Sequence, residues 1–231
     1  MDDRHVSSLA AKVGLGGVFA AVRWLALAVL VDAGSPFTAT KLDVHQFVIF
    51  ERDSGPVNYY RIVYQPEGPA IHAHYRPPLE TVTLASKIPE VLRTKAKRLR
   101  WRWRVLQFPT HGNDCVPGRA DSAASVFLTF KRGLKYYTLK YVWSTEGVKG
   151  TVCDPRRNPF YNRDTIVLES GGPKETWLEE EIDLRTEFLK HFEPGGTDSD
   201  VPDFVGIGVF TDGDQTKSEA EADYAQFFVL S

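Results

Sequence analysis

Hydrophobic and polar residues alternate along most of the chain from about Asn58 to the C-terminus. Alternation with a period of two is typical of strands that bury one face, and Gly, Pro, Asn and Asp between the runs favour turns. Short, evenly spaced strands predict an all-β fold, a two-sheet antiparallel β-sandwich. The pattern predicts strands over residues 58–65, 70–75, 82–86, 98–108, 125–131, 135–143, 164–169, 177–183, 204–211 and 225–230.

Two segments have helical character instead. In 184–192, Leu184, Phe188 and Phe192 recur at the spacing of one helical face. The segment 216–223 is short and rich in Ala and Glu. The sandwich should therefore carry one or two short helices.

The clearest unit is a hairpin formed by strands 125–130 and 135–143, with Gly133 supplying the positive φ of a tight turn. Folding the two strands about this turn brings Cys115 and Cys153 near each other at the open end of the ladder. In an oxidising compartment the pair can form a disulfide, whereas in a cytosolic protein two free thiols are the default.

The N-terminal segment has a different pattern. Between Val13 and Val31 the only charged residue is Arg23, and small residues and a turn follow. This predicts an export signal or retained anchor over residues 1–40, ahead of a single sandwich domain over 41–231. The acidic start and the interior arginine depart from a standard signal, so a buried N-terminal helix and a marginal membrane span remain alternatives.

Composition and charge narrow the class of protein. A length of 231 residues suits one sandwich domain, and 28 Lys and Arg residues against 30 Asp and Glu residues give a net charge of -2. Nucleic-acid binders usually carry a global positive charge, so no nucleic-acid partner is expected. The leader predicts an exported protein, periplasmic or extracellular, that touches the membrane only through an uncleaved leader.

The strand 98–106 carries the densest positive charge. Its alternation directs Leu99, Trp101, Trp103 and Val105 to one side and a row of arginines to the other: Arg98, Arg100, Arg102 and Arg104. Guanidinium groups suit carboxylates, which favours a track for an acidic polysaccharide. The alternative is structural pairing with acids of a neighbouring strand, for which Glu179, Glu180, Glu181 and Asp183 are the candidates.

Acidic and histidine residues suggest metal chemistry at two places. Asp212 and Asp214 lie in a tight turn and Asp223 follows, so these oxygens are candidate Ca²⁺ ligands. The alternative is that these aspartates bond their own turn and cap the next segment. His72 and His74 face one side of a predicted strand, but a third zinc ligand is not evident unless His45 or His111 supplies it.

Several motifs in the second half resemble the bacterial family catalogued as domain of unknown function 3047. They are Leu99-Arg-Trp-Arg-Trp-Arg104, Tyr141-Val-Trp143, Asn158-Pro-Phe160 and Val205-Gly-Ile-Gly-Val-Phe-Thr-Asp-Gly-Asp-Gln-Thr216. The resemblance implies an exported jelly-roll sandwich related to galactose-binding-like domains, and it implies no activity. The chain departs from the family at Ala120, where members tend to have an acid beside Asp121.

The favoured function is non-catalytic binding of a carbohydrate or another cell-envelope ligand. Aromatic residues such as Tyr136, Trp143, Tyr161 and Trp177 can provide stacking surfaces. The alternatives are a glycan hydrolase or lyase on the same scaffold, for which Asp121, Glu146 and Asp164 are the nearest to catalytic acids, and an envelope structural or assembly protein. No cofactor is expected apart from the Ca²⁺ considered above. The candidate ligand-binding residues are Arg100, Arg102, Arg104, Asp121 and Trp143.

Overall fold

The computed structural model describes residues 36–50 and 57–231. The predicted leader, apart from residues 36–40, lies outside the described residues. Within the described part of the chain, no helix is long and apolar enough to cross a bilayer.

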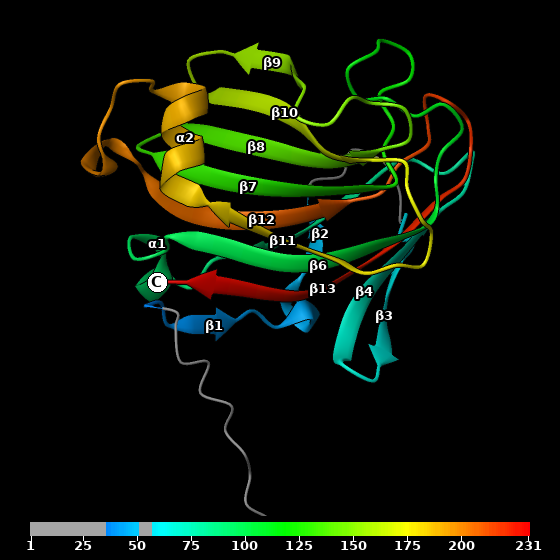
Figure 1. Cartoon of the computed structure of the whole chain (residues 1–231), viewed down its shortest axis with the longest axis horizontal. Helices are drawn as coiled ribbons and strands as arrows, with labels where there is room; N and C mark the ends of the chain where they lie inside the picture. The colour runs from blue at the N-terminus through cyan, green and yellow to red at the C-terminus, as the bar shows by residue number, and fades with distance from the viewer. Residues whose placement is uncertain (1–35, 51–56) are drawn as a thin grey trace, which may run out of the picture. The chain divides into compact units, whose positions relative to one another are not determined.

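The strands form two sheets that pack against each other (Figure 1). One, the six-stranded sheet, has the order β11-β6-β13-β4-β3, with β1 also paired to β13. Its strands are β1 (Ala39–Lys41), β3 (Tyr60–Gln65), β4 (Gly68–Tyr75), β6 (Arg98–Gln107), β11 (Leu178–Asp183) and β13 (Ala220–Leu230).

The other, the seven-stranded sheet, has the order β2-β5-β12-β7-β8-β10-β9. Its strands are β2 (Val48–Phe50), β5 (Thr83–Lys87), β7 (Ala124–Arg132), β8 (Lys135–Ser144), β9 (Val152–Arg157), β10 (Tyr161–Ser170) and β12 (Asp203–Phe210). The helices are α1 (Glu90–Arg93) and α2 (Leu184–Phe192), with 3-10 turns η1 (Val44–Gln46) and η2 (Asp198–Asp200). The all-β, two-sheet prediction is confirmed.

The core between the sheets is built from alternate residues of central strands. On β6, Trp101 and Trp103 are fully buried and meet edge to face, with ring centroids 5.6 Å apart. Trp103 also packs against Trp143 of β8, 5.6 Å away between centroids. The predicted alternation along this strand is confirmed, because its apolar side chains point inward and its arginines point to the outer face.

One strand pair departs from the antiparallel prediction. β10 runs parallel to β8, whereas the other paired strands of the described chain are antiparallel. The chain leaves β8, returns along β9 at the sheet edge, and then inserts β10 between β8 and β9. Because β9 has already reversed the direction, β10 must run the same way as β8.

The second helix prediction is wrong. Residues 216–223, expected to be helical, form a turn and then the start of β13. Ala220, Ala222 and Tyr224 are buried at alternate positions, and this stretch pairs with β4 on one side and β6 on the other. Tertiary pairing therefore overrides the helix propensity of Ala and Glu. The other helix prediction, 184–192, is confirmed as α2.

The hairpin prediction and its consequence are both confirmed. β7 pairs with β8 up to the turn at Gly133, and Cys115 is bonded to Cys153. At the N-terminal side, β1 pairs with β13 through Ala39 and Thr40. These two residues, placed in the predicted leader, are therefore part of the six-stranded sheet.

Candidate functional site

The outer face of the six-stranded sheet carries the arginine row of β6, and its members have different partners. Arg98 lies 2.7 Å from Glu181 and 3.7 Å from Asp183. Structural pairing, the alternative to a ligand track, therefore holds for Arg98. Arg104 is paired too, but with Asp223 of β13, through contacts of 2.7 and 2.8 Å.

The two middle arginines lack such partners. Among the described residues, neither Arg100 nor Arg102 forms an ion pair. Arg100 lies over the ring of Phe228, at 5.2 Å, and its Nε is buried without a hydrogen-bond partner. Arg102 lies over the ring of Trp177, at 5.3 Å. These two side chains therefore lie against aromatic rings, and their cross-strand neighbours on β11, Glu181 and Glu179, form no ion pair with them.

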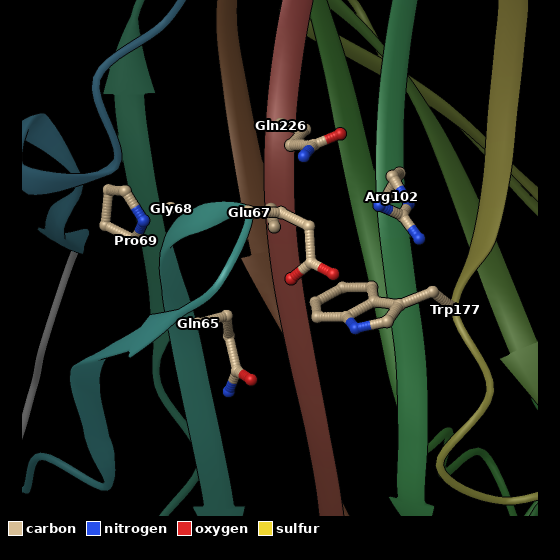
Figure 2. A pocket seen from close by; sticks show the side chains of 8 residues that line it. Gln65, Glu67, Gly68, Pro69, Arg102, Trp177 and Gln226 are labelled. Atoms are coloured by element: carbon tan, nitrogen blue, oxygen red, sulfur yellow. The ribbon is translucent and has the colours of Figure 1, made fainter. Parts of the chain in front are cut away.

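Arg102 and Trp177 line a shallow surface hollow that is open to solvent and has a cavity volume of only about 10 Å³. Figure 2 shows the indole of Trp177 extending toward the turn between β3 and β4, with the Glu67 carboxylate directed toward it. Gln226 of β13 lies beside Arg102 in the same view. The full lining is Gln65, Glu67, Gly68, Pro69, Arg102, Trp177, Ala225 and Gln226.

A bulge in β13 shapes this hollow. The register between β13 and β6 shifts between Ala225 and Phe228, and Gln226 has a φ of 54°. A positive φ is uncommon for a residue other than Gly, and bulges redirect side chains at functional sites. On the opposite side, Gly68 has a φ of 119°, which only Gly adopts readily, and this allows the tight β3–β4 turn that presents Glu67.

The acidic cluster has a different membership from the predicted one. Asp121 and Asp212 are buried, and their carboxylate oxygens lie with that of exposed Asp214 within 4.8 Å of one another. Asp223 is elsewhere, between Arg104 and His72 on the six-stranded sheet. The predicted grouping of Asp223 with the other two is wrong, because residues 220–223 are a strand that directs this side chain to the outer face.

Backbone N–H groups donate hydrogen bonds to two carboxylates of this cluster. Asp121 accepts the N–H groups of Gln215 and Thr216 at 3.2 and 2.6 Å, and Asp212 accepts that of Ser122 at 2.9 Å. Burial raises the pKa of Asp212 well above its usual value. Burial, and then a bond from Asp121, also raises the pKa of Asp214. The carboxyls thus hold the turn together, and Ca²⁺ binding by Asp212 and Asp214 stays a prediction.

The remaining predicted residues fall into two groups. Trp143 is fully buried and donates its indole N–H to the Gly171 carbonyl at 2.7 Å, so the prediction that it contacts a ligand is wrong. Asp121 is buried in the acidic cluster and does not line the hollow. His45 bonds to Asp43, and His111 bonds to Glu146, so neither joins His72 and His74.

One acid, Glu180, has an unusually high pKa. Glu180 of β11 accepts the Trp103 indole N–H at 3.2 Å and therefore points toward the interior. Burial, and then the charge of Glu169, raises the pKa of Glu180 to about 7. A carboxyl with this pKa can donate a proton near neutral pH, but Glu180 is separate from the residues that line the hollow.

Comparison with solved structures finds similar folds. The family 11 carbohydrate-binding module from Clostridium thermocellum, in complex with a mixed-linked tetrasaccharide, has 11% identity and a TM-score of 0.43, over 83% of this chain and 94% of that one. The xyloglucanase domain of a type three effector from Sinorhizobium fredii has 10% identity and a TM-score of 0.38, over 85% and 99%. The Trichoderma harzianum endoglucanase 3 has 10% identity and a TM-score of 0.40, over 87% and 99%.

No curated protein matches the sequence. The family comparison agrees with the resemblance seen in the motifs, since the matched region contains β6, the hairpin and the Thr211–Thr216 turn. Residues 48–228 match the family described as "Protein of unknown function (DUF3047)", and the chain belongs to this family.

Proposed function

We propose that the outer face of the six-stranded sheet binds a glycan that carries carboxylate groups. The observation that carries the proposal is the hollow in which Trp177 lies beside Arg102, a guanidinium without an acidic partner among the described residues. A pyranose ring can pack its C–H face on an indole, and its carboxylate can accept two parallel bonds from a guanidinium. Arg100, the next outward residue of β6, extends the positive charge along the strand.

The remaining lining supports sugar binding as well. Gln65, Glu67 and Gln226 offer amide and carboxylate groups to sugar hydroxyls. The hollow is open and shallow, which suits a segment within a long polymer better than an enclosed small molecule. A glycan of the cell envelope is the source we favour, because the Cys115–Cys153 disulfide supports an exported protein in an oxidising compartment.

Calorimetric titration with oligogalacturonate as the carboxylated glycan and a cello-oligosaccharide as the neutral one tests the proposal. Trp177→Ala should weaken oligogalacturonate binding at least tenfold, or ~1.4 kcal/mol, by removing the stacking surface. Arg100→Ala combined with Arg102→Ala should weaken it similarly and should abolish any preference over the neutral glycan.

Arg98→Ala is the matched control, since this arginine lies on the same strand and face but is already bonded to Glu181. We expect it to change the affinity less than twofold. If oligogalacturonate affinity survives the double substitution, or if Arg98→Ala weakens binding as much as Arg102→Ala, the assigned surface is wrong.

A catalytic function is the second candidate, and the pKa of Glu180 is the observation that favours it. Incubation of the protein with the bound glycan, followed by assay of reducing ends, separates the two functions. Binding without release of reducing ends supports the binding function. Release that Glu180→Gln abolishes would establish a glycan hydrolase or lyase instead.

A further inference from the structure

A second cluster lies on the same outer face, and the glycan proposal does not use it. His72 and His74 alternate along β4, so both side chains point outward, and Glu221 of β13 is the cross-strand partner of His74. One ligand atom from each of the three lies within 4.8 Å of the others. We propose that His72, His74 and Glu221 bind a divalent transition-metal ion of the Zn²⁺ class.

The distances suit a tetrahedral centre. Oε1 of Glu221 lies 3.3 Å from Nε2 of His72 and 3.6 Å from Nδ1 of His74. Zinc bonds to nitrogen and oxygen are about 2.0–2.2 Å long, so two ligand atoms of a tetrahedral site are separated by about 3.3–3.6 Å. The Glu221 oxygen therefore already has nearly the separation from each imidazole nitrogen that one shared ion requires.

The unsatisfied nitrogen of His72 is the independent sign of a ligand. Its side chain is only 7% exposed, and its Nε2 has no hydrogen-bond partner. Nδ1 of the same ring lies 2.8 Å from Asp223. When Nδ1–H donates to that carboxylate, the lone pair of Nε2 faces Glu221. Two electron-pair donors facing each other at this distance repel unless a cation lies between them.

The surroundings of His72 match those of metal-binding histidines. Such histidines usually donate their other ring N–H to a carboxylate, which fixes the tautomer and the ring orientation. Asp223 is itself fixed, because Arg104 contacts its second oxygen at 2.7 and 2.8 Å. The bonded series Arg104–Asp223–His72 therefore holds one ligand rigidly in place.

Exposed charges around the site decide how an ion enters. Arg76 approaches both ring nitrogens of His74, with Nη2 3.3 Å from Nδ1 and Nε 3.1 Å from Nε2, and Glu219 lies 3.3 Å from Nε2. Both side chains are more than half exposed, so Arg76 can rotate away from Nδ1, and Glu219 can then accept the Nε2–H of His74 while Nδ1 binds the ion. Arg61 faces His72 from β3, and its positive charge opposes binding. The two carboxylates, Glu219 and Glu221, offset this opposition.

The donor set selects the class of metal. Two imidazoles and a carboxylate suit Zn²⁺ and its neighbours Co²⁺, Ni²⁺ and Cu²⁺, whereas Ca²⁺ and Mg²⁺ prefer oxygen ligands throughout. The site therefore differs in chemistry from the acidic turn of Asp121, Asp212 and Asp214. Its place beside Arg104, which also lies 4.9 Å from the Trp177 ring, puts it next to the glycan hollow.

Calorimetric titration of chelator-treated full-length protein with ZnCl₂ tests the site, and the visible spectrum of the Co²⁺ form gives its geometry. We expect one ion per chain and a tetrahedral Co²⁺ spectrum. His74→Ala and Glu221→Gln, both at partly exposed positions, should each weaken Zn²⁺ binding at least tenfold. Asp223→Asn should weaken it by about 10–100-fold through the orientation of His72.

His45→Ala is the matched control, because it removes an exposed histidine bonded to an aspartate away from the cluster. It should leave Zn²⁺ affinity unchanged. Absence of Zn²⁺ binding by the unaltered protein would mean that a proton, not a metal, lies between His72 and Glu221. If Glu221→Gln and His74→Ala each bind Zn²⁺ as tightly as the unaltered protein, the bound zinc lies elsewhere, and either outcome overturns the proposal. Glycan titrations of Trp177→Ala are independent of both.

Discussion

The outward side chains of the two sheets differ in their exposure to solvent, as a comparison of β8 with β6 shows. On the seven-stranded sheet, the outward residues of β8 are covered: Thr138, Lys140, Val142 and Ser144 are 4%, 8%, 0% and 0% exposed. On the six-stranded sheet, the arginines of β6 and the ring of Trp177 remain partly open. The outer side of β8 is therefore covered, whereas the outer face of the six-stranded sheet, here called the open face, leaves these side chains accessible to ligands.

The loop before β7 covers the outer side of β8. Asp114 of this loop reaches Nζ of Lys140 at 2.6 Å, and the next residue, Cys115, is bonded to β9. Burial by itself lowers the pKa of Lys140, but the charges of Asp114 and Asp212 outweigh it and raise that pKa. A buried charge with a fixed partner serves stability, whereas a half-exposed guanidinium without one can serve binding.

The largest expected effect is at Asp114. Asp114→Ala leaves the Lys140 ammonium buried without its partner, which should lower the free energy of unfolding by about 3–5 kcal/mol. Arg100→Ala, on the open face, should change it by less than about 0.5 kcal/mol. Urea unfolding of both variants measures the difference. Asp114→Ala combined with Lys140→Met should recover most of the loss, and equal stability of the two single variants would contradict the contrast between the faces.

The disulfide should have the next largest effect. Cys115→Ser with Cys153→Ser releases the loop of about 39 residues that the bond closes, and the chain-entropy model assigns ~3–4 kcal/mol to that closure. The melting temperature should fall by roughly 10 °C. Glycan binding at the hollow should persist below the new melting temperature, because the bond lies on the other sheet. Loss of binding in the folded variant would show that the two faces are not independent.

The alternation of side chains made much of the fold predictable. It placed Trp101 and Trp103 inside and Arg100 and Arg102 outside, because a strand with one buried face permits a single register. The hairpin turn at Gly133 brought the cysteines together for the same reason. The parallel pairing of β10 was not predictable, since it depends on where β9 lies in the sheet.

The hollow could be predicted only in part. Alternation directs Arg102 outward, but Glu67 and Trp177 reach the hollow from a turn and a loop, beside strands whose order in the sheet the pattern does not contain. The bulge at Gln226 left no signal, because Gln rarely adopts a positive φ. The sequence pattern does not identify Glu221 as a partner of the histidines, because the Ala and Glu content of residues 216–223 favours a helix. In a strand, Glu221 and Asp223 share one face, whereas Asp223 in a helix would not oppose His72.

The smallest expected effect concerns β11, where the two environments meet within one strand. Glu180 points inward with a pKa of about 7, while Glu179 is exposed on the open face. A folded-state pKa above the usual 4.5 means that the folded protein binds the proton more tightly than the unfolded chain. Stability should therefore fall as the pH rises from about 4.5 to about 7, and the penalty should then persist.

Glu180→Gln removes this penalty while keeping an acceptor for the Trp103 indole. Because the side chain is partly exposed, we expect a gain of only ~1 kcal/mol at pH 8, or about 2–4 °C in melting temperature, and almost none at pH 4.5. Scanning calorimetry at both pH values measures it, with Glu179→Gln as the matched control. An equal gain at the two pH values, or the same gain from Glu179→Gln, would mean that removal of a surface charge and not an inward carboxylate accounts for the effect. A gain confined to Glu180→Gln at high pH would show that buried and exposed environments alternate from one residue to the next along this edge strand.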